Sequence, residues 1–189
     1  MIKYFELQRV SDSFELELSE AINRVIKSGW YIQGNENAKS ESRFAEYCGA
    51  KYCVGTGNGM DALTLIFMAY QQLGIMQPGD EVIVPANTCI ATIIGVLRAG
   101  LKPILCEPCW DTCNINPEKI EECITSRTRA ILPVHLYGRC ADMDPILAIA
   151  HRYHLKVVED LAQSHGAVYK GKHAGHLGDA AAFSFYPSK

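Results

Sequence analysis

Short apolar runs alternate with helical segments along most of the chain, and no other feature of the sequence constrains the fold as strongly. The runs are residues 52–55, 81–84, 103–106, 130–132 and 156–159. Alternation of this kind is typical of stacked βαβ units, whose strands pair in parallel. We therefore predict an α/β fold with a mainly parallel (mixed) sheet flanked by helices.

Local signals place the ends of the expected helices. Apolar residues recur at helical spacing from Phe14 to Val25 and stop before Gly29, which predicts an opening helix closed by a glycine. Further helix boundaries are expected at Gly74, Gly100, Asn116-Pro117 and Asp144-Pro145. Because no repeat or Pro/Gly/Ser-rich linker interrupts the chain, we expect one domain over residues 1–189.

Composition and charge narrow the class of protein. The chain has 189 residues, 48% of them hydrophobic, which suits one domain with a buried core. Its formal net charge of -3 comes from interspersed acids and bases, so no basic stripe favours a nucleic acid partner. The sequence predicts neither a signal peptide nor a membrane span, and we expect a cytoplasmic protein. The eight cysteines are expected to be reduced and mostly buried.

Polar and glycine residues follow four of the expected strands. They are Gly57-Asn58-Gly59-Met60-Asp61, Asn87-Thr88, His135, and Asp160 with Gln163. Since ligands bind beyond the carboxyl ends of the strands in an open α/β sheet, these residues are expected to converge on one binding rim.

The glycine-rich turn at residues 55–63 leads from one expected strand into an apolar helix. Glycines let backbone amides approach an anion, and a helix N-terminus adds unpaired N–H groups, so the turn fits a phosphate cradle. It has neither the Lys-Ser/Thr pair of a P-loop nor the glycine spacing of a dinucleotide fold. Taken alone, it fits a simple tight turn equally well.

Two further residues are candidates for cofactor chemistry. Asp160 ends an apolar run, where a carboxylate can hold the proton of a ring nitrogen, although a helix cap or turn residue would look the same. Lys189 follows the small and aromatic residues 178–187, which could desolvate its amine for attack on an aldehyde. A terminal lysine is also commonly just solvated.

Six segments, in this order, resemble the sugar aminotransferases of the DegT/StrS type, which belong to fold type I of the pyridoxal-phosphate enzymes. The segments are residues 29–31, 58–63, 85–88, 133–138, 159–166 and 184–189. The resemblance implies that residues 1–189 form the large pyridoxal-phosphate-binding domain. It also implies that this domain is incomplete, because family members continue for a comparable length.

The same resemblance implies roles around the ring of pyridoxal 5'-phosphate. Lys189 would carry the cofactor as a Schiff base and shuttle a proton during catalysis. Asp160 would pair with the pyridine nitrogen, and Gln163 would contact the phenolic side of the ring.

Further roles are implied at the phosphate and at the face of the ring. Gly59, Met60 and Ser184 would hold the phosphate, and Asp61 would help to order that turn. Cys89 occupies a position at which the family commonly has an aromatic residue stacked on the ring. Because sulfur offers less contact area than an aromatic ring, weaker retention of the cofactor is expected.

The activity implied by the resemblance is transfer of an amino group, from glutamate, to a nucleotide-linked keto-deoxysugar by a homodimer with shared active sites. Residues 58–61, 134–138 and 141–145 look most like members acting at C3 of a dTDP-linked 3-keto-6-deoxyhexose. A C4 aminotransferase of the same family is an alternative, as is a non-catalytic sensor or regulator that keeps the fold. Lys189 argues against the deoxygenating branch, in which histidine replaces this lysine.

The spacing of Cys106 and Cys109 is the C-x-x-C of zinc and redox sites. No second ligand pair follows at zinc-finger spacing. We therefore expect no metal site and a structural role for this segment.

Overall fold

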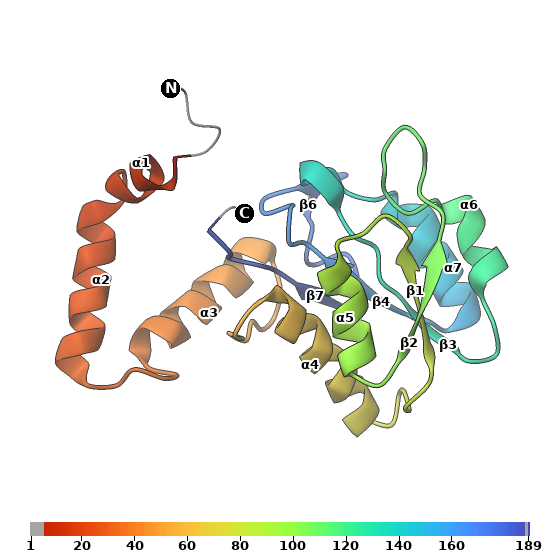
Figure 1. Cartoon of the computed structure of the whole chain (residues 1–189), viewed down its shortest axis with the longest axis horizontal. Coiled ribbons are helices and arrows are strands. Elements are labelled where there is room, and N and C mark those ends of the chain that lie inside the picture. Colours follow the sequence, from red (N-terminus) through yellow and green to blue (C-terminus); the bar gives the residue numbers. More distant parts are fainter. Residues whose placement is uncertain (1–5, 188) are drawn as a thin grey trace. The chain divides into compact units, whose positions relative to one another are not determined.

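The computed structural model describes residues 6–187 and 189, which form two compact units. The first unit comprises residues 6–55 with 186–187, and the second comprises residues 56–185 with 189. In Figure 1 the helices of the first unit are red to orange, and the elements of the second run from yellow to blue.

Helices make up most of the first unit. They are α1 (Leu7–Asp12), α2 (Glu15–Ser28) and α3 (Asn35–Cys48). Gly29 follows α2 with a φ of 67°, in the left-handed region that glycine adopts without strain, which confirms the predicted glycine stop. Arg24 on α2 forms an ion pair of 2.9 Å with Glu36 on α3, and this contact spans the turn between the two helices.

Residues 52–55 form no strand, so the strand predicted there is wrong. Tyr52 and Val54 are exposed, and the N–H of Gly55 donates to Glu41 Oε1 at 2.7 Å instead of to a neighbouring strand. An apolar run becomes a strand only where a second strand receives its hydrogen bonds, and a side chain takes that place here.

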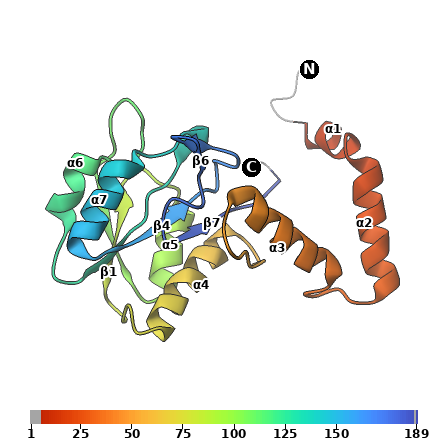
Figure 2. The same ribbon diagram turned by 180° about the vertical axis from the view of Figure 1, so that it is seen from behind.

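The second unit is a parallel sheet with helices on both faces (Figures 1 and 2). In chain order its elements are α4 (Gly59–Gln72), β1 (Glu81–Pro85), α5 (Ile90–Arg98), β2 (Lys102–Cys106), α6 (Pro117–Ile120), η1 (Glu121–Cys123), β3 (Thr128–Ile131), η2 (Leu136–Gly138), α7 (Met143–Tyr153), β4 (Lys156–Asp160), β5 (Val168–Tyr169), β6 (Lys172–His173) and β7 (Ala180–Ala182). The strand order is β2-β1-β3-β4-β7, and every pairing in it is parallel. β5 and β6 form a separate antiparallel pair. The predicted α/β class is confirmed, and four of the predicted strands coincide with β1, β2, β3 and β4.

Side chains of the sheet alternate between two apolar layers. Val82 and Val84 pack with residues of α4 and α5, whereas Ile83 packs with residues of α6 and α7. On β4, Val158 belongs to the first layer and Val157 to the second. Since successive strand residues point to opposite faces, Glu159 and Asp160 at the end of β4 also face opposite ways.

The helix boundaries follow the sequence signals with one exception. Gly74 and Gly100 have φ values of 71° and 74° after α4 and α5, and Asn116 caps α6 before a proline, as predicted. The start predicted at Asp144-Pro145 is wrong, because α7 begins at Met143 with Asp142 as its N-cap. Pro145 then lies in the first turn, where a backbone N–H has no intrahelical acceptor and its loss costs nothing.

The eight cysteines are free thiols, but the expectation that most are buried is wrong. Cys48 and Cys106 are buried, Cys89 and Cys113 are exposed, and the remaining four are partly exposed. Cys89 begins a helix and Cys113 lies in a loop, so both fall outside the apolar runs that suggested burial. Within residues 6–187 and 189, no helix has the length and apolar character that crossing a bilayer requires.

Candidate active site

The predicted site residues of the second unit gather at one edge of the sheet. Asp160 is the last residue of β4, and Ser184 follows the end of β7. Gly59 begins α4, and Cys89 is the N-cap of α5. Because the strands are parallel, their carboxyl ends share this edge, which is where α/β folds bind ligands.

Asp160 is a buried carboxylate held by two donors. Its side chain is fixed by the Thr92 hydroxyl, which donates to Oδ2 at 2.8 Å, and by the N–H of Ala162, which donates to Oδ1 at 3.0 Å. Burial raises the pKa of Asp160, while these two hydrogen bonds act in the opposite direction. Among the described residues no ion pair engages Asp160, so a cationic ligand group would find an acceptor here.

The glycine turn meets the end of β7 at Gly59. A Cβ at this position would lie 3.0 Å from the carbonyl oxygen of Phe183 and 3.0 Å from Ser184 Cβ, so only glycine fits without displacement. The N–H groups of Gly59 and Met60 lie in the first turn of α4, where backbone N–H groups have no acceptor within the helix. This close approach brings two backbone N–H groups and Ser184 together, which is the composition of a phosphate cradle.

Asp61 orders the same turn, in agreement with the role expected for it. Its backbone N–H donates to Asn58 Oδ1 at 2.9 Å, and its Oδ2 accepts from Asn58 Nδ2 at 2.8 Å. Its other carboxylate oxygen forms an ion pair of 2.9 Å with Arg98 of α5. The negative charge of Asp61 is therefore offset by Arg98, which removes an obstacle to binding an anion nearby.

Gln163 has a fixed orientation. Its Oε1 accepts the backbone N–H of Tyr137 at 3.1 Å, which leaves the amide NH2 of Gln163 available as a donor. Tyr137 has a φ of 56°, and the turn at η2 thereby aims its N–H at the glutamine. An amide donor suits a phenolate oxygen.

Lys189 is exposed, and its charge reaches the site. Burial raises the pKa of Asp160, and the charge of Lys189 is among the weaker influences that lower it. Burial also lowers the pKa of His165, and the charge of Lys189 lowers it further. The His165 ring contacts Phe183 and Phe185 at centroid distances of 5.5 and 5.1 Å, so aromatic side chains line the segment leading to the lysine.

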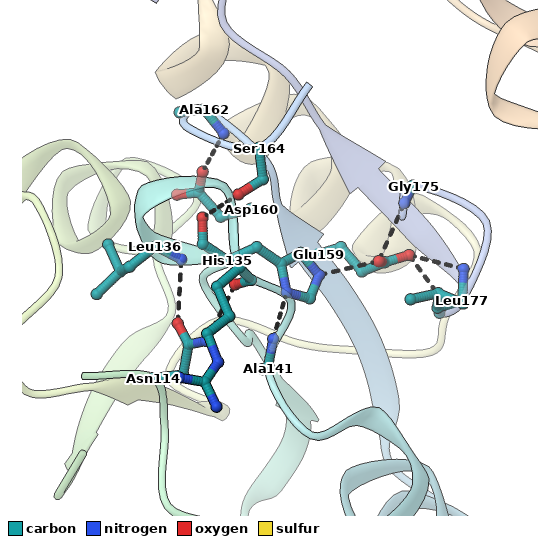
Figure 3. Close-up of polar contacts among 12 residues, drawn as sticks. Asn114, His135, Leu136, Ala141, Glu159, Asp160, Ala162, Ser164, Gly175 and Leu177 are labelled. Carbon is teal, nitrogen blue, oxygen red and sulfur yellow. Dashed lines mark hydrogen bonds and ion pairs between the residues drawn. The ribbon is translucent and has the colours of Figure 1, made fainter. Parts of the chain in front are cut away.

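The backbone of His135 lies beside Asp160, whose carbonyl oxygen accepts the His135 N–H at 3.0 Å, but the His135 side chain does not face the binding rim, so the prediction fails for the side chain. Its ring is fully buried and its Nε2 lies 3.0 Å from Glu159 Oε2, while the N–H of Ala141 donates to Nδ1 at 2.9 Å. The Ala141 bond requires an unprotonated Nδ1, so Nε2 carries the ring proton and donates to Glu159. Figure 3 shows Glu159 reaching from this ring toward Gly175 and Leu177, away from the Asp160 carboxylate.

Thr92 was not among the residues expected from the sequence. It lies in the first turn of α5, is 1% exposed, and contacts Asp160 across 68 residues of sequence. The signal that could have indicated it is the pair Thr88 and Thr92, two hydroxyls four residues apart in an otherwise apolar segment.

Cys106, the first cysteine of the C-x-x-C segment, is a buried free thiol. Burial, followed by the neighbouring Cys123, raises the pKa of Cys106 to about 12, which disfavours the thiolate form that thiol exchange uses. Within the described part of the chain, no group of three or more His, Cys, Asp and Glu side chains could hold a metal ion.

Together these groups fit pyridoxal phosphate. The Gly59 cradle excludes a side chain where a phosphate would approach, and the buried Asp160 carboxylate forms no ion pair with any described residue, so a protonated pyridine could supply its counter-ion. A parallel α/β sheet that carries such groups at its carboxyl edge fits the class that the sequence resembles, the large-domain fold of the fold type I aminotransferases.

The chain belongs to the DegT/DnrJ/EryC1/StrS aminotransferase family, which its residues 13–189 match. It is 56% identical over 185 residues to dTDP-3-amino-3,6-dideoxy-alpha-D-galactopyranose transaminase from Aneurinibacillus thermoaerophilus, covering 98% of this chain and 50% of that protein. The chain thus spans about half the length of the curated relatives it matches.

Solved structures agree with this assignment. DesV from S. venezuelae superposes with a TM-score of 0.91 at 45% identity, over 100% of this chain and 50% of that one. NtdA from Bacillus subtilis, solved with bound cofactor PMP, gives a TM-score of 0.87 at 35% identity, over 100% of this chain and 42% of that one.

Proposed function

We propose that the intact protein is a pyridoxal-phosphate-dependent aminotransferase that transfers an amino group to a nucleotide-linked keto-deoxysugar. Membership of the aminotransferase family supports the reaction class. The observation that carries the proposal within this chain is Asp160, a buried carboxylate with no ion-pair partner among the described residues, at the edge that also holds Gly59 and Ser184.

Different residues of this chain would hold the phosphate, the ring nitrogen and the phenolic oxygen of the cofactor. The N–H groups of Gly59 and Met60, with Ser184, would bind the phosphate. Asp160 would keep a proton on the ring nitrogen, and the NH2 group of Gln163 would donate to the phenolic oxygen. When bound, pyridoxal phosphate supplies a ring that accepts electrons from the substrate.

Lys189 would attach the cofactor through Nζ and then act as a general base and acid. A lysine amine removes a proton from carbon only when it is neutral. In this role Nζ would take the proton from the α-carbon of the amino donor and hold it for the next proton transfer.

For the substrate, we propose C3 of a dTDP-linked 3-keto-6-deoxyhexose, with glutamate as the amino donor. The name of the Aneurinibacillus relative, a transaminase of a dTDP-3-amino-3,6-dideoxy sugar, supports this choice. We also propose that the active protein is a homodimer with shared sites, of which residues 1–189 supply the cofactor-binding large domain.

The test uses the intact protein with 15N-labelled glutamate and, in separate reactions, dTDP-linked 3-keto- and 4-keto-6-deoxyhexoses. NMR of the product is expected to show 15N on C3. Label on C4 would assign the alternative position, and a product without label would remove glutamate as donor.

Two variants test the residues. Lys189→Ala should abolish transamination and the visible absorbance band of the bound cofactor, while Lys172→Ala, at an exposed lysine of β6, should retain both. Asp160→Asn should lower turnover far more than cofactor content, because an amide cannot stabilise the ring proton by charge. Wild-type turnover in Lys189→Ala would refute the proposal.

A further inference from the structure

A pair of threonine hydroxyls connects α5 to the proposed cofactor-binding carboxylate. Thr92 Oγ1 lies 2.8 Å from Asp160 Oδ2, and Thr88 Oγ1 lies 2.8 Å from Thr92 Oγ1. An ionised carboxylate only accepts hydrogen bonds, so the single hydroxyl proton of Thr92 points to Asp160. The oxygen of Thr92 must then accept from Thr88, and the direction of both hydrogen bonds is fixed.

These hydrogen bonds favour the charged form of Asp160. The carboxylate is 6% exposed, and burial raises its pKa, which favours the neutral acid. The Ala162 N–H and the Thr92 hydroxyl both lower that pKa, each from a different carboxylate oxygen. Two donors on two oxygens also fix the plane of the carboxylate, so charge and orientation are set together.

Thr92 ties a second site position to the same carboxylate. Its backbone N–H donates to the carbonyl oxygen of Cys89 at 3.0 Å, and Cys89 is the N-cap of α5 at the proposed ring-stacking position. One residue therefore contacts both the carboxylate that would meet the ring nitrogen and the backbone that would face the ring.

We propose that Thr92 is a positioning residue that keeps Asp160 ionised and aimed at the ring nitrogen of the cofactor, with Thr88 orienting the Thr92 hydroxyl. The inference rests on the role proposed above for Asp160. It adds that recognition of the ring nitrogen depends on a hydroxyl of α5, which does not itself touch the cofactor.

The experiment measures dissociation constants of two ligands for the intact protein after removal of its cofactor. One ligand is pyridoxal phosphate, and the other is an analogue in which carbon replaces the ring nitrogen. Thr92→Val removes the hydroxyl and keeps the branched shape. It is expected to weaken pyridoxal phosphate about tenfold or more, the scale of a hydrogen bond to a charged group, and to leave the analogue unchanged.

Control variants separate positioning from packing. Thr92→Ser keeps the hydroxyl and should restore most of the affinity for pyridoxal phosphate. Thr88→Val should give a smaller loss of the same kind, confined to the ligand with the ring nitrogen. Circular dichroism of each variant checks that the fold is retained.

The outcome of the binding measurements shows whether the role of Thr92, the role of Asp160 or the proposed function itself is wrong. Equal losses for both ligands in Thr92→Val, or no loss for either, would overturn the positioning role. If the wild-type protein bound neither ligand, the proposed function itself would fail. If it bound both equally well, the role of Asp160 at the ring nitrogen would fail, and the inference about Thr92 with it.

Discussion

Replacing Glu159 with glutamine removes a charge but almost no volume, and it tests the buried network behind the site. Glu159 is fully buried, and each of its two carboxylate oxygens accepts two hydrogen bonds. Oε1 accepts from the N–H groups of Leu177 and Gly178, each at 2.9 Å. Oε2 accepts from Gly175 N–H and His135 Nε2, each at 3.0 Å.

The expected cost follows from counting donors. In either orientation, the NH2 group of a glutamine would face two N–H donors, each of which would lose the acceptor that Glu159 provides. His135 cannot relieve this by moving its ring proton, because Nδ1 already accepts from Ala141. Two buried donors left without acceptors cost about 1–3 kcal/mol each, so Glu159→Gln should destabilise the fold by about 2–6 kcal/mol.

Urea unfolding of the intact protein, followed by circular dichroism, measures this loss. Glu118→Gln, at an exposed glutamate of α6, is the matched control and should change the free energy of unfolding by less than about 0.5 kcal/mol. A loss below about 1 kcal/mol for Glu159→Gln would refute the reasoning, because it would mean that the two donors find other partners.

The pH dependence provides a second measurement on the same variant. Burial alone would raise the pKa of Glu159, but hydrogen bonds from His135 and from the N–H groups of Gly178 and Gly175 outweigh it and hold the pKa below 4.5. A carboxylate with a lowered pKa in the folded state stabilises the fold above its unfolded pKa and loses that contribution as pH falls. The difference in stability between wild type and variant should therefore narrow on acidification below about pH 4.5.

Three further outcomes concern the cofactor site. Gly59→Ala should weaken binding of pyridoxal phosphate, measured by titration, because its Cβ would press on a backbone oxygen and on Ser184 Cβ at 3.0 Å; overpacking of this kind costs about 1–3 kcal/mol. Unchanged affinity would show that the cradle has room. Arg98→Gln should weaken binding of inorganic phosphate by exposing the charge of Asp61, and Asp61→Asn in the same protein should reverse the loss; no reversal would exclude this electrostatic link. Arg98→Gln should change the free energy of unfolding by less than about 1 kcal/mol, because the Arg98 and Asp61 side chains are both partly exposed. Cys89→Tyr should strengthen binding of the cofactor by about 1 kcal/mol, because Cys89 is exposed and leaves space for a stacked ring. A larger dissociation constant of the cofactor for this variant would show that the space is already filled.

Features governed by local chemistry were predictable from the sequence. Gly29, Gly74 and Gly100 end helices because glycine adopts the left-handed backbone that follows a last helical turn. The ends of the apolar runs gave the position of Asp160 at the edge of the sheet, because parallel strands in an α/β fold have a known polarity. In both cases the physical cause lies within a few residues of the signal.

Features that depend on a distant partner were not predictable. The run at residues 52–55 has the composition of a strand, but composition does not reveal whether a second strand lies beside it. His135 follows a strand like a ligand-binding residue, yet its ring points to Glu159, 24 residues later. Thr92 meets Asp160 only because the first turn of α5 lies beside the end of β4, and nothing within the helix specifies that neighbour.

The last two residues of β4 impose a strict requirement on the length of that strand. Glu159 binds the loop at Gly175 and Asp160 faces α5, although the two carboxylates differ by one methylene and are adjacent in sequence. A shift of one residue in pairing exchanges the faces of every side chain in a strand. A single-residue insertion or deletion within β4 would therefore aim the longer carboxylate into the site and the shorter one at the loop, so this strand tolerates substitutions far better than changes of length.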